Sequence, residues 1–190
     1  MNNPSAIAQV ILVTGAARSG KSEWAEALAA QSGRSVVYVA TAQSHPDDPE
    51  WQARIGRHQQ RRPAHWQTLA VPVQLTKVLD NAAAADCLLV DSLGTWLANL
   101  LEQDEPTWEQ TVQGLLSSLS QVQCQVILVA EETGWGVVPA YALGRLFRDR
   151  LGNLTRRIGA IANPVYLVTG GYALNLCQLG EPLGKSQAER

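Results

Sequence analysis

The chain has 190 residues, of which 46% are hydrophobic, and this length and composition predict a single domain over residues 1–190 with a buried core. The formal net charge of −2 and the pI of about 5.9 give no indication of a nucleic-acid partner. The sequence contains neither a secretory signal pattern nor an apolar run of the roughly 18 residues that a membrane span requires. We therefore expect a cytoplasmic protein without a membrane span.

Short apolar strands alternate with helices along the chain. The strands are rich in Val, Ile and Leu without polar alternation, which is typical of parallel strands that are buried on both faces. We expect strands at 10–14, 36–40, 87–91, 125–130 and 165–169, and helices at 21–31, 49–62, 73–83, 93–101, 107–120 and 139–162, with Gly152 as a candidate break in the last helix. This alternation predicts an α/β fold, with a mainly parallel central sheet in a three-layer arrangement like that of the P-loop NTPases.

The first expected strand runs into Gly-Ala-Ala-Arg-Ser-Gly-Lys-Ser at residues 15–22. Two glycines separated by four residues, then Lys21 and Ser22 and then a helix, match the phosphate-binding P-loop. Glycine lets several backbone N–H groups converge on one anion, and the positive end of the helix dipole adds to the attraction. We expect Lys21 to reach the β- and γ-phosphates of a nucleoside triphosphate and Ser22 to bind Mg²⁺. An ordinary strand-to-helix turn is the alternative.

Polar residues follow other expected strands, at the edge of the sheet where ligands bind in such folds. Asp91 ends an apolar run as a Walker B carboxylate does, so we expect it to hold Mg²⁺ directly or through water, beside Ser22. Its alternative role is to cap the helix that follows. Glu131 and Glu132 also follow a strand. Metal binding, acceptance of a proton from a substrate hydroxyl, and a purely structural turn all fit this pair.

The expected helix at 49–62 has an apolar face and a basic face, with His58 on the border between them. The basic face carries Arg54, Arg57 and Arg61. Burial beside arginines disfavours a protonated imidazole, and neutral imidazole is the nucleophilic form. The arginines would steady a phosphate under attack. A solvated basic face with a partly buried histidine is the alternative.

Two further groups of residues receive a structural interpretation. The widely spaced Cys87, Cys124 and Cys177 lack metal-ligand spacing and are expected to be buried free thiols. The helix at 139–162 carries a basic stripe, which we interpret first as a solvated or inter-subunit face and second as a phosphate contact. The stripe consists of Arg145, Arg148, Arg156 and Arg157.

Five segments carry a resemblance to a known family. They are residues 15–22, Tyr38-Val-Ala-Thr-Ala at 38–42, Arg-Ile-Gly-Arg-His-Gln-Gln-Arg-Arg-Pro-Ala-His-Trp at 54–66, Leu-Val-Asp-Ser-Leu at 89–93 and Glu-Thr-Gly-Trp-Gly-Val-Val-Pro at 132–139. In order and spacing they resemble the bifunctional adenosylcobinamide kinase / adenosylcobinamide-phosphate guanylyltransferase family of cobalamin biosynthesis. The likeness runs from about residue 10 to 168, and the histidine segment joined to a P-loop is its most specific part.

The resemblance implies roles for individual residues. His58 matches the histidine that accepts GMP covalently, and we expect it and Lys21 to be catalytic. Some relatives carry a second histidine where this chain has Arg57. The expected metal ligands are Ser22 and Asp91. The expected nucleotide contacts are Gly15, Ala16, Ala17, Arg18, Ser19, Gly20, Lys21, Ser22, Ala40, Thr41, Ala42, Gln59, Gln60, Arg61, Arg62 and Asp91.

The resemblance also implies the reaction partners, which are Mg²⁺, GTP and ATP as substrates, and adenosylcobinamide and its phosphate as the corrinoid substrates of a homotrimer. In the first step, the aminopropanol hydroxyl of adenosylcobinamide takes a γ-phosphoryl group held at residues 15–22. In the second, His58 attacks the α-phosphate of GTP, pyrophosphate leaves, and the phosphorylated corrinoid takes GMP from the histidine.

Two other functions remain open from the sequence. A P-loop kinase for a small metabolite, without the second activity, would use His58 only to stabilise its structure. A nucleotide-dependent switch or energy-coupling ATPase is the other, and it ranks last because the chain lacks both the guanine-specifying Asn-Lys-x-Asp motif and the Leu-Ser-Gly-Gly-Gln transporter motif.

Overall fold

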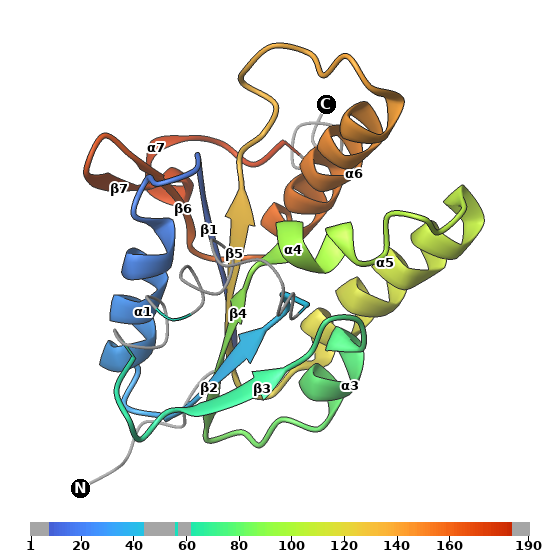
Figure 1. Ribbon diagram of the computed structural model, residues 1–190. Coiled ribbons are helices and arrows are strands. Elements are labelled where there is room, and N and C mark those ends of the chain that lie inside the picture. The colour runs from blue at the N-terminus through green and yellow to red at the C-terminus, as the bar shows by residue number, and fades with distance from the viewer. Residues whose placement is uncertain (1–7, 44–55, 57–61, 184–190) are drawn as a thin grey trace, which may run out of the picture.

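A seven-stranded sheet forms the centre of the computed structural model, which describes residues 8–43, 56 and 62–183 (Figure 1). The strand order is β3-β2-β4-β5-β1-β6-β7. Neighbouring strands are parallel except β6 and β7, which form an antiparallel pair. The strands are β1 (Gln9–Gly15), β2 (Ser35–Ala40), β3 (Gln67–Ala70), β4 (Asp86–Asp91), β5 (Gln125–Glu131), β6 (Val165–Thr169) and β7 (Tyr172–Asn175). The predicted α/β fold with a mainly parallel sheet is confirmed.

Helices cover both faces of the sheet (Figure 1). Successive side chains of a buried strand point to opposite faces, so the sheet separates two apolar cores. Leu12 packs in the larger core with α3–α6, whereas its neighbour Val13 packs in the smaller core with α1. The helices are α1 (Lys21–Gln31), α3 (Leu75–Asp80), α4 (Leu93–Ala98), α5 (Glu105–Gln121), α6 (Ala142–Gly159) and α7 (Leu176–Leu179).

The expected strands are all present, but three short elements at the edges of the fold were not predicted. β3 and β7 have four residues each and end the sheet, where one neighbouring strand suffices to pair them. β3 is the mostly polar Gln-Thr-Leu-Ala, which lacks the apolar signal of the central strands. α7 is a single turn of four residues. Short elements of this kind form through their tertiary contacts rather than through local sequence.

α6 differs from the helix expected at 139–162. α6 begins at Ala142 rather than near residue 139, and it continues through Gly152, so the candidate break is wrong. Burial of Leu151, Leu154 and Ile158 offsets the roughly 1 kcal/mol that an interior glycine costs a helix. The helix expected at 49–62 lies outside the described residues apart from Gly56, which is helical, and Arg62, which lies in a bend.

The cysteines divide into two classes. Cys87 and Cys124 are buried as expected, but Cys177 is exposed on α7, so the prediction of a buried thiol is wrong there. α7 contacts β6 and β7 at the edge of the sheet, and all four of its residues are exposed. Within the described ranges, no helix combines the length and the apolar character needed to cross a membrane.

Candidate nucleotide-binding site

The glycine-rich turn joins the end of β1 to the start of α1, and its glycines serve two different purposes. Gly20 adopts a positive φ of 94°, which favours glycine. Gly15 has no room for a side chain, since a Cβ there would lie 2.4 Å from the carbonyl oxygen of Val168. α1 has no side-chain cap at its first turn, so its N–H groups are available to an anion. The turn has the features of the expected P-loop.

Lys21 is the first residue of α1 and is only 7% exposed. Its Nζ donates to the carbonyl oxygen of Ala16 at 3.3 Å, within the same turn. Among the described residues, no carboxylate forms an ion pair with it. A largely buried ammonium whose partner is a neutral carbonyl remains poorly compensated. Lys21 is therefore placed to receive an anion at the turn.

Asp91 lies at the same edge of the sheet as the P-loop. β5 is the one strand between β4 and β1, and Asp91 and Val13 are both in register with Val129. Two strand spacings separate them, or roughly 10 Å. The half-buried Asp91 accepts a hydrogen bond of 2.8 Å at Oδ2 from the hydroxyl of Tyr38 on β2. Tyr38 belongs to the core on the α1 side, so this carboxylate lies on the same face of the sheet as α1.

The Tyr38 hydroxyl stays protonated because burial raises its pKa above the ordinary tyrosine value, and the negative charge of Asp91 raises the pKa further. The hydrogen bond to Asp91 therefore has a fixed donor. Ser22 and Asp91 together offer a hydroxyl and a carboxylate, which are oxygen ligands that suit Mg²⁺ alongside phosphate oxygens and water. No group of three or more His, Cys, Asp or Glu side chains in the described residues could hold a metal ion by itself.

The alternative role of Asp91 as a helix cap is wrong, because the next residue caps α4. Ser92 Oγ accepts from the backbone N–H of Thr95 at 3.3 Å, and Thr95 Oγ1 accepts from the N–H of Ser92 at 3.2 Å. This reciprocal pair satisfies both ends of a capping box. The Asp91 carboxylate is left for other interactions.

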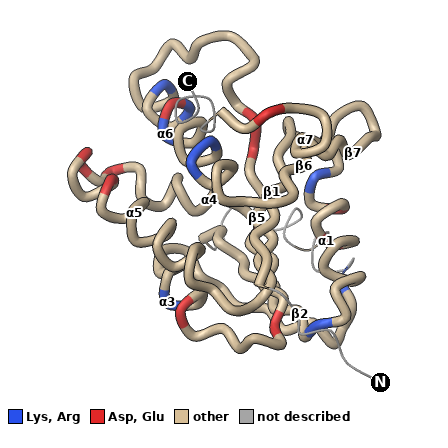
Figure 2. Tube along the Cα trace, turned by 180° about the vertical axis from the view of Figure 1, so that it is seen from behind, with Lys and Arg blue, Asp and Glu red and all other residues tan. Residues whose placement is uncertain are grey.

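Glu131 and Glu132 have different partners. Glu131 Oε1 accepts from Ser92 Oγ at 2.5 Å, and its Oε2 accepts from the N–H of Gly94 at 3.0 Å. Glu132 Oε1 accepts from Thr14 Oγ1 at 2.6 Å, next to the P-loop. Figure 2 shows these acidic residues at the end of β5 and the basic start of α1 along one edge of the sheet. Both carboxylates therefore make hydrogen bonds within the fold, as the structural interpretation predicts, and Glu132 does so next to the P-loop.

Thr41 is fully buried just after β2. Its Oγ1 donates to the carbonyl oxygen of Ser92 at 2.7 Å and accepts from the Ser92 N–H at 2.8 Å. The Thr41 side chain therefore joins β2 to β4. Any contact of residues 40–42 with a nucleotide, as expected from the sequence, would involve backbone groups or the less buried Ala40 and Ala42.

Arg62 stacks on Tyr38, with its guanidinium carbon 3.4 Å from the ring centroid. Its Nη1 lies 3.4 Å from Thr68 Oγ1, while its buried Nε has no hydrogen-bond partner among the described residues. Arg62 thus connects the end of the histidine segment to the Tyr38–Asp91 pair. The other predicted residues of that segment lie outside the described residues: Arg54, Arg57, His58, Gln59, Gln60 and Arg61.

The structure adds Thr14, Tyr38 and Ser92 to the polar groups at this edge, and the sequence reasoning assigned no role to them. Thr14 directly precedes the first glycine of the P-loop, and Ser92 directly follows Asp91. Their position next to a recognised motif was the signal in the sequence that could have indicated a role for these two residues. Their partners are far away along the chain, so the contacts themselves had no local signal.

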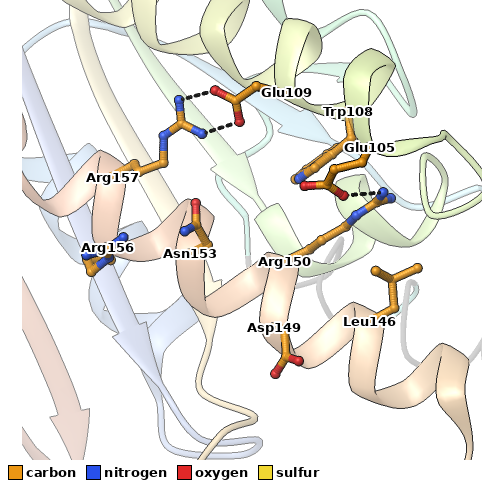
Figure 3. A pocket seen from close by; sticks show the side chains of 9 residues that line it. All are labelled: Glu105, Trp108, Glu109, Leu146, Asp149, Arg150, Asn153, Arg156 and Arg157. Carbon is orange, nitrogen blue, oxygen red and sulfur yellow. Dashed lines mark hydrogen bonds and ion pairs between the residues drawn. The ribbon is translucent and has the colours of Figure 1, made fainter.

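Three arginines of α6, namely Arg150, Arg156 and Arg157, line a separate hollow of about 540 Å³ between α5 and α6 (Figure 3). Arg157 forms an ion pair with Glu109 at 2.7 Å, and the buried Arg150 pairs with Glu105 at 3.0 Å. No residue of the P-loop lines this hollow. Two α6 arginines therefore fasten α6 to α5, and the phosphate contact considered for the basic stripe gains no support from them.

Comparison with known sequences shows that this chain has similar relatives of known family. The sequence model of the family described as cobinamide kinase / cobinamide phosphate guanyltransferase matches residues 11–176. The bifunctional adenosylcobalamin biosynthesis protein CobP of Pseudomonas aeruginosa is 45% identical over 174 residues, covering 90% of this chain and 98% of the relative. The bifunctional adenosylcobalamin biosynthesis protein CobU of Salmonella typhimurium is 37% identical over 182 residues, covering 88% of this chain and 99% of the relative.

Solved structures share the fold at much lower sequence identity. An ATPase of a bacterial type III secretion system superposes with a TM-score of 0.52 and 10% identity, covering 91% of this chain and 53% of the ATPase. A protein of Pyrococcus horikoshii superposes with a TM-score of 0.57 and 7% identity, covering 90% of this chain and 86% of that one. At these identities the likeness concerns the fold alone.

Proposed function

The chain belongs to the cobinamide kinase / cobinamide phosphate guanyltransferase family, and we propose that it phosphorylates adenosylcobinamide and then transfers GMP from GTP to the product. The observation that carries this proposal is the P-loop, inside the matched range 11–176, with its buried Lys21, which forms no ion pair with a described carboxylate. A cation held in this way suits the phosphates that both reactions handle.

In the kinase step, the aminopropanol hydroxyl oxygen of adenosylcobinamide attacks the γ-phosphorus of a nucleoside triphosphate. The bond from that phosphorus to the bridging oxygen breaks, and a nucleoside diphosphate leaves. Lys21 and the N–H groups at the start of α1 hold the phosphates in place. Ser22 and Asp91 are the residues that would hold Mg²⁺, which when bound neutralises phosphate charge. GTP and ATP both suit this site, because its residues bind the phosphate groups that the two nucleotides share.

In the guanylyltransferase step, we assign the nucleophile to His58 on the strength of the family resemblance and of its spacing from Ile55. A ring nitrogen attacks the α-phosphorus of GTP and expels pyrophosphate, which leaves a phosphoramidate. A phosphate oxygen of the corrinoid then attacks the same phosphorus, the N–P bond breaks, and adenosylcobinamide-GDP forms. Gln59, Gln60, Arg61 and Arg62 are proposed nucleotide contacts in this step.

We also carry over from the family a homotrimeric assembly of single-domain chains in the cytoplasm. Size-exclusion chromatography with light scattering tests the assembly. A monomer at micromolar concentration would contradict it.

Intact-mass spectrometry after incubation with GTP and Mg²⁺ tests the function most directly. The proposal expects a mass increase of one GMP per chain and phosphorylation of adenosylcobinamide by the same preparation. Kinase activity without a GMP adduct would favour a kinase with a single activity. Nucleotide binding without corrinoid-dependent turnover would favour a nucleotide switch.

A further inference from the structure

The carboxylate of Glu132 is fastened to the strand that carries the P-loop. Its backbone N–H donates to the carbonyl oxygen of Gly15 at 2.9 Å, and its Oε1 accepts from Thr14 Oγ1 at 2.6 Å. Thr14 is itself only 4% exposed, so its hydroxyl has little freedom to turn away. Backbone and side chain together fix this carboxylate beside the first glycine of the phosphate-binding turn.

The neighbouring carboxylate, that of Glu131, binds the start of α4 instead. Both oxygens of Glu131 accept hydrogen bonds from the start of α4, one from Ser92 Oγ and one from the N–H of Gly94. A Cβ at Gly94 would collide with Glu131 Oε2, so the carboxylate packs directly against this backbone. Glu131 therefore stabilises the start of α4 and positions the chain that follows Asp91.

Glu132 keeps one oxygen free. Its Oε2 accepts no hydrogen bond from any described residue, no described Lys, Arg or His forms an ion pair with it, and the side chain is only half-buried. The negative charge of a carboxylate next to an anion-binding turn is unfavourable, because it repels the bound anion, unless a proton or a cation reaches the carboxylate there. The substrate hydroxyl of a kinase supplies such a proton.

The face of the sheet on which Glu132 lies suits an in-line reaction. Leu12 belongs to the core on the α3–α6 side, so by alternation Thr14 of β1 points to the same side, and Glu132, just beyond the end of β5, is hydrogen-bonded to Thr14 there. α1, which holds the phosphates, covers the opposite face. An acceptor hydroxyl beside Glu132 would therefore approach the γ-phosphorus from the side away from α1. In-line transfer requires the attacking and leaving oxygens on opposite sides of the phosphorus.

We propose that Glu132 is the general base of the kinase step, while Glu131 only positions the start of α4. The inference rests on the proposed kinase activity. As the hydroxyl oxygen bonds to the γ-phosphorus and the bond to the bridging oxygen breaks, the hydroxyl proton passes to Glu132 Oε2 and then to water. General bases of this kind contribute about 10²- to 10⁴-fold to the rate.

Paired amide variants separate the two carboxylates. Glu132→Gln keeps its size and its acceptor for Thr14 but can no longer take a proton. We expect its kinase kcat to fall about 10²- to 10⁴-fold with little change in the KM for nucleotide, and the acid limb of its pH–rate profile to disappear. Attachment of GMP from GTP should stay near the wild-type rate. Glu131→Gln should instead lower the melting temperature and retain the acid limb.

The position of the carboxylate is tested independently through Thr14. Thr14→Val should lower the kinase kcat about tenfold, the effect of one hydrogen bond, and Thr14→Ser should restore it. A kinase kcat of Glu132→Gln within threefold of wild type would overturn the proposal, as would an equal loss of kinase rate and GMP attachment in a folded variant. If wild-type protein showed no kinase turnover, the proposed function itself would fail instead.

Discussion

The hydroxyl of Tyr38 donates a hydrogen bond of 2.8 Å to Oδ2 of Asp91, from one strand to the next across the pair β2 and β4. Tyr38 is 3% exposed and Arg62 stacks on its ring, so burial and stacking together hold the ring that carries the donor hydroxyl. A carboxylate whose one oxygen is fixed in this way presents the other in a defined direction. Outer partners of this type tune metal binding.

Tyr38→Phe is expected to raise the Mg²⁺ concentration for half-maximal kinase rate by about tenfold, the lower range for loss of a partner behind a ligand. Asp91→Asn should raise it further, because the amide offers the metal no charge. Titration of kinase rate against Mg²⁺ at saturating nucleotide measures both effects. An unchanged Mg²⁺ dependence in Asp91→Asn would remove Asp91 from the metal site.

Lys21→Ala should reduce the kinase kcat by on the order of 10²- to 10³-fold while the chain still folds, because a charge that stabilises the transition state is lost. Lys77→Ala is the matched control, since Lys77 is an exposed lysine on α3. Steady-state turnover and circular dichroism measure activity and fold. A Lys21→Ala enzyme within threefold of wild type would show that phosphate binds elsewhere.

His58→Ala should abolish attachment of GMP and guanylyl transfer, yet leave much of the kinase rate because residues 15–22 are unchanged. In wild type the adduct should break down in acid and survive alkali, as a phosphoramidate does. Peptide mapping after reaction with labelled GTP locates it. His65→Ala, at an exposed histidine, is the control. An adduct on His45 or His65, or one that persists in His58→Ala, would refute the assignment.

Gly152→Ala is expected to stabilise the protein by about 0.5–1 kcal/mol, because alanine suits a helix interior better than glycine. Gly152 is exposed within α6, and a Cβ there would meet nothing within 4 Å. The melting temperature should rise by about 2–4 °C per kcal/mol. Gly15→Ala, where a Cβ would meet the carbonyl of Val168, should instead lower it. A lower melting temperature for Gly152→Ala would indicate a broken helix.

The thiols should differ in reactivity and in their effect on stability. Cys177 should react with a thiol reagent in the native protein, and Cys87 and Cys124 only after unfolding. Burial raises the pKa of Cys87 from 9.0 to about 11. Its contribution to stability is therefore complete below about pH 9 and is lost as the pH rises through about 11. The advantage of wild type over Cys87→Ala in unfolding free energy should shrink over that range. A constant difference would contradict the raised pKa.

The sequence predicted the parts of the molecule that depend on local order. The central strands are unbroken runs of Val, Ile and Leu, and the P-loop is a contiguous motif, so both were visible without tertiary information. The bond between Thr14 and Glu132 joins residues 118 positions apart and exists only because β5 pairs with β1. From the sequence alone, Glu131 and Glu132 could be described only as an acidic pair. The strand order and register decide which partner each carboxylate contacts, and neither was visible in the sequence.

The side chain of Asn99 governs how part of the ligand edge can move. Its Nδ2 donates to the carbonyl oxygens of Thr41 and Pro72, at 2.8 Å each, so one amide holds the chain after β2 and the chain after β3 against α4. Ser92 fastens the end of β4 to Thr41 as well. Local opening at one of these strand ends must break bonds at the others, which makes them a single cooperative unit. The P-loop takes part in none of these bonds and is joined instead to the end of β5, through the N–H of Glu132 and the carbonyl oxygen of Gly15, so the two halves of the ligand edge are held by separate sets of bonds.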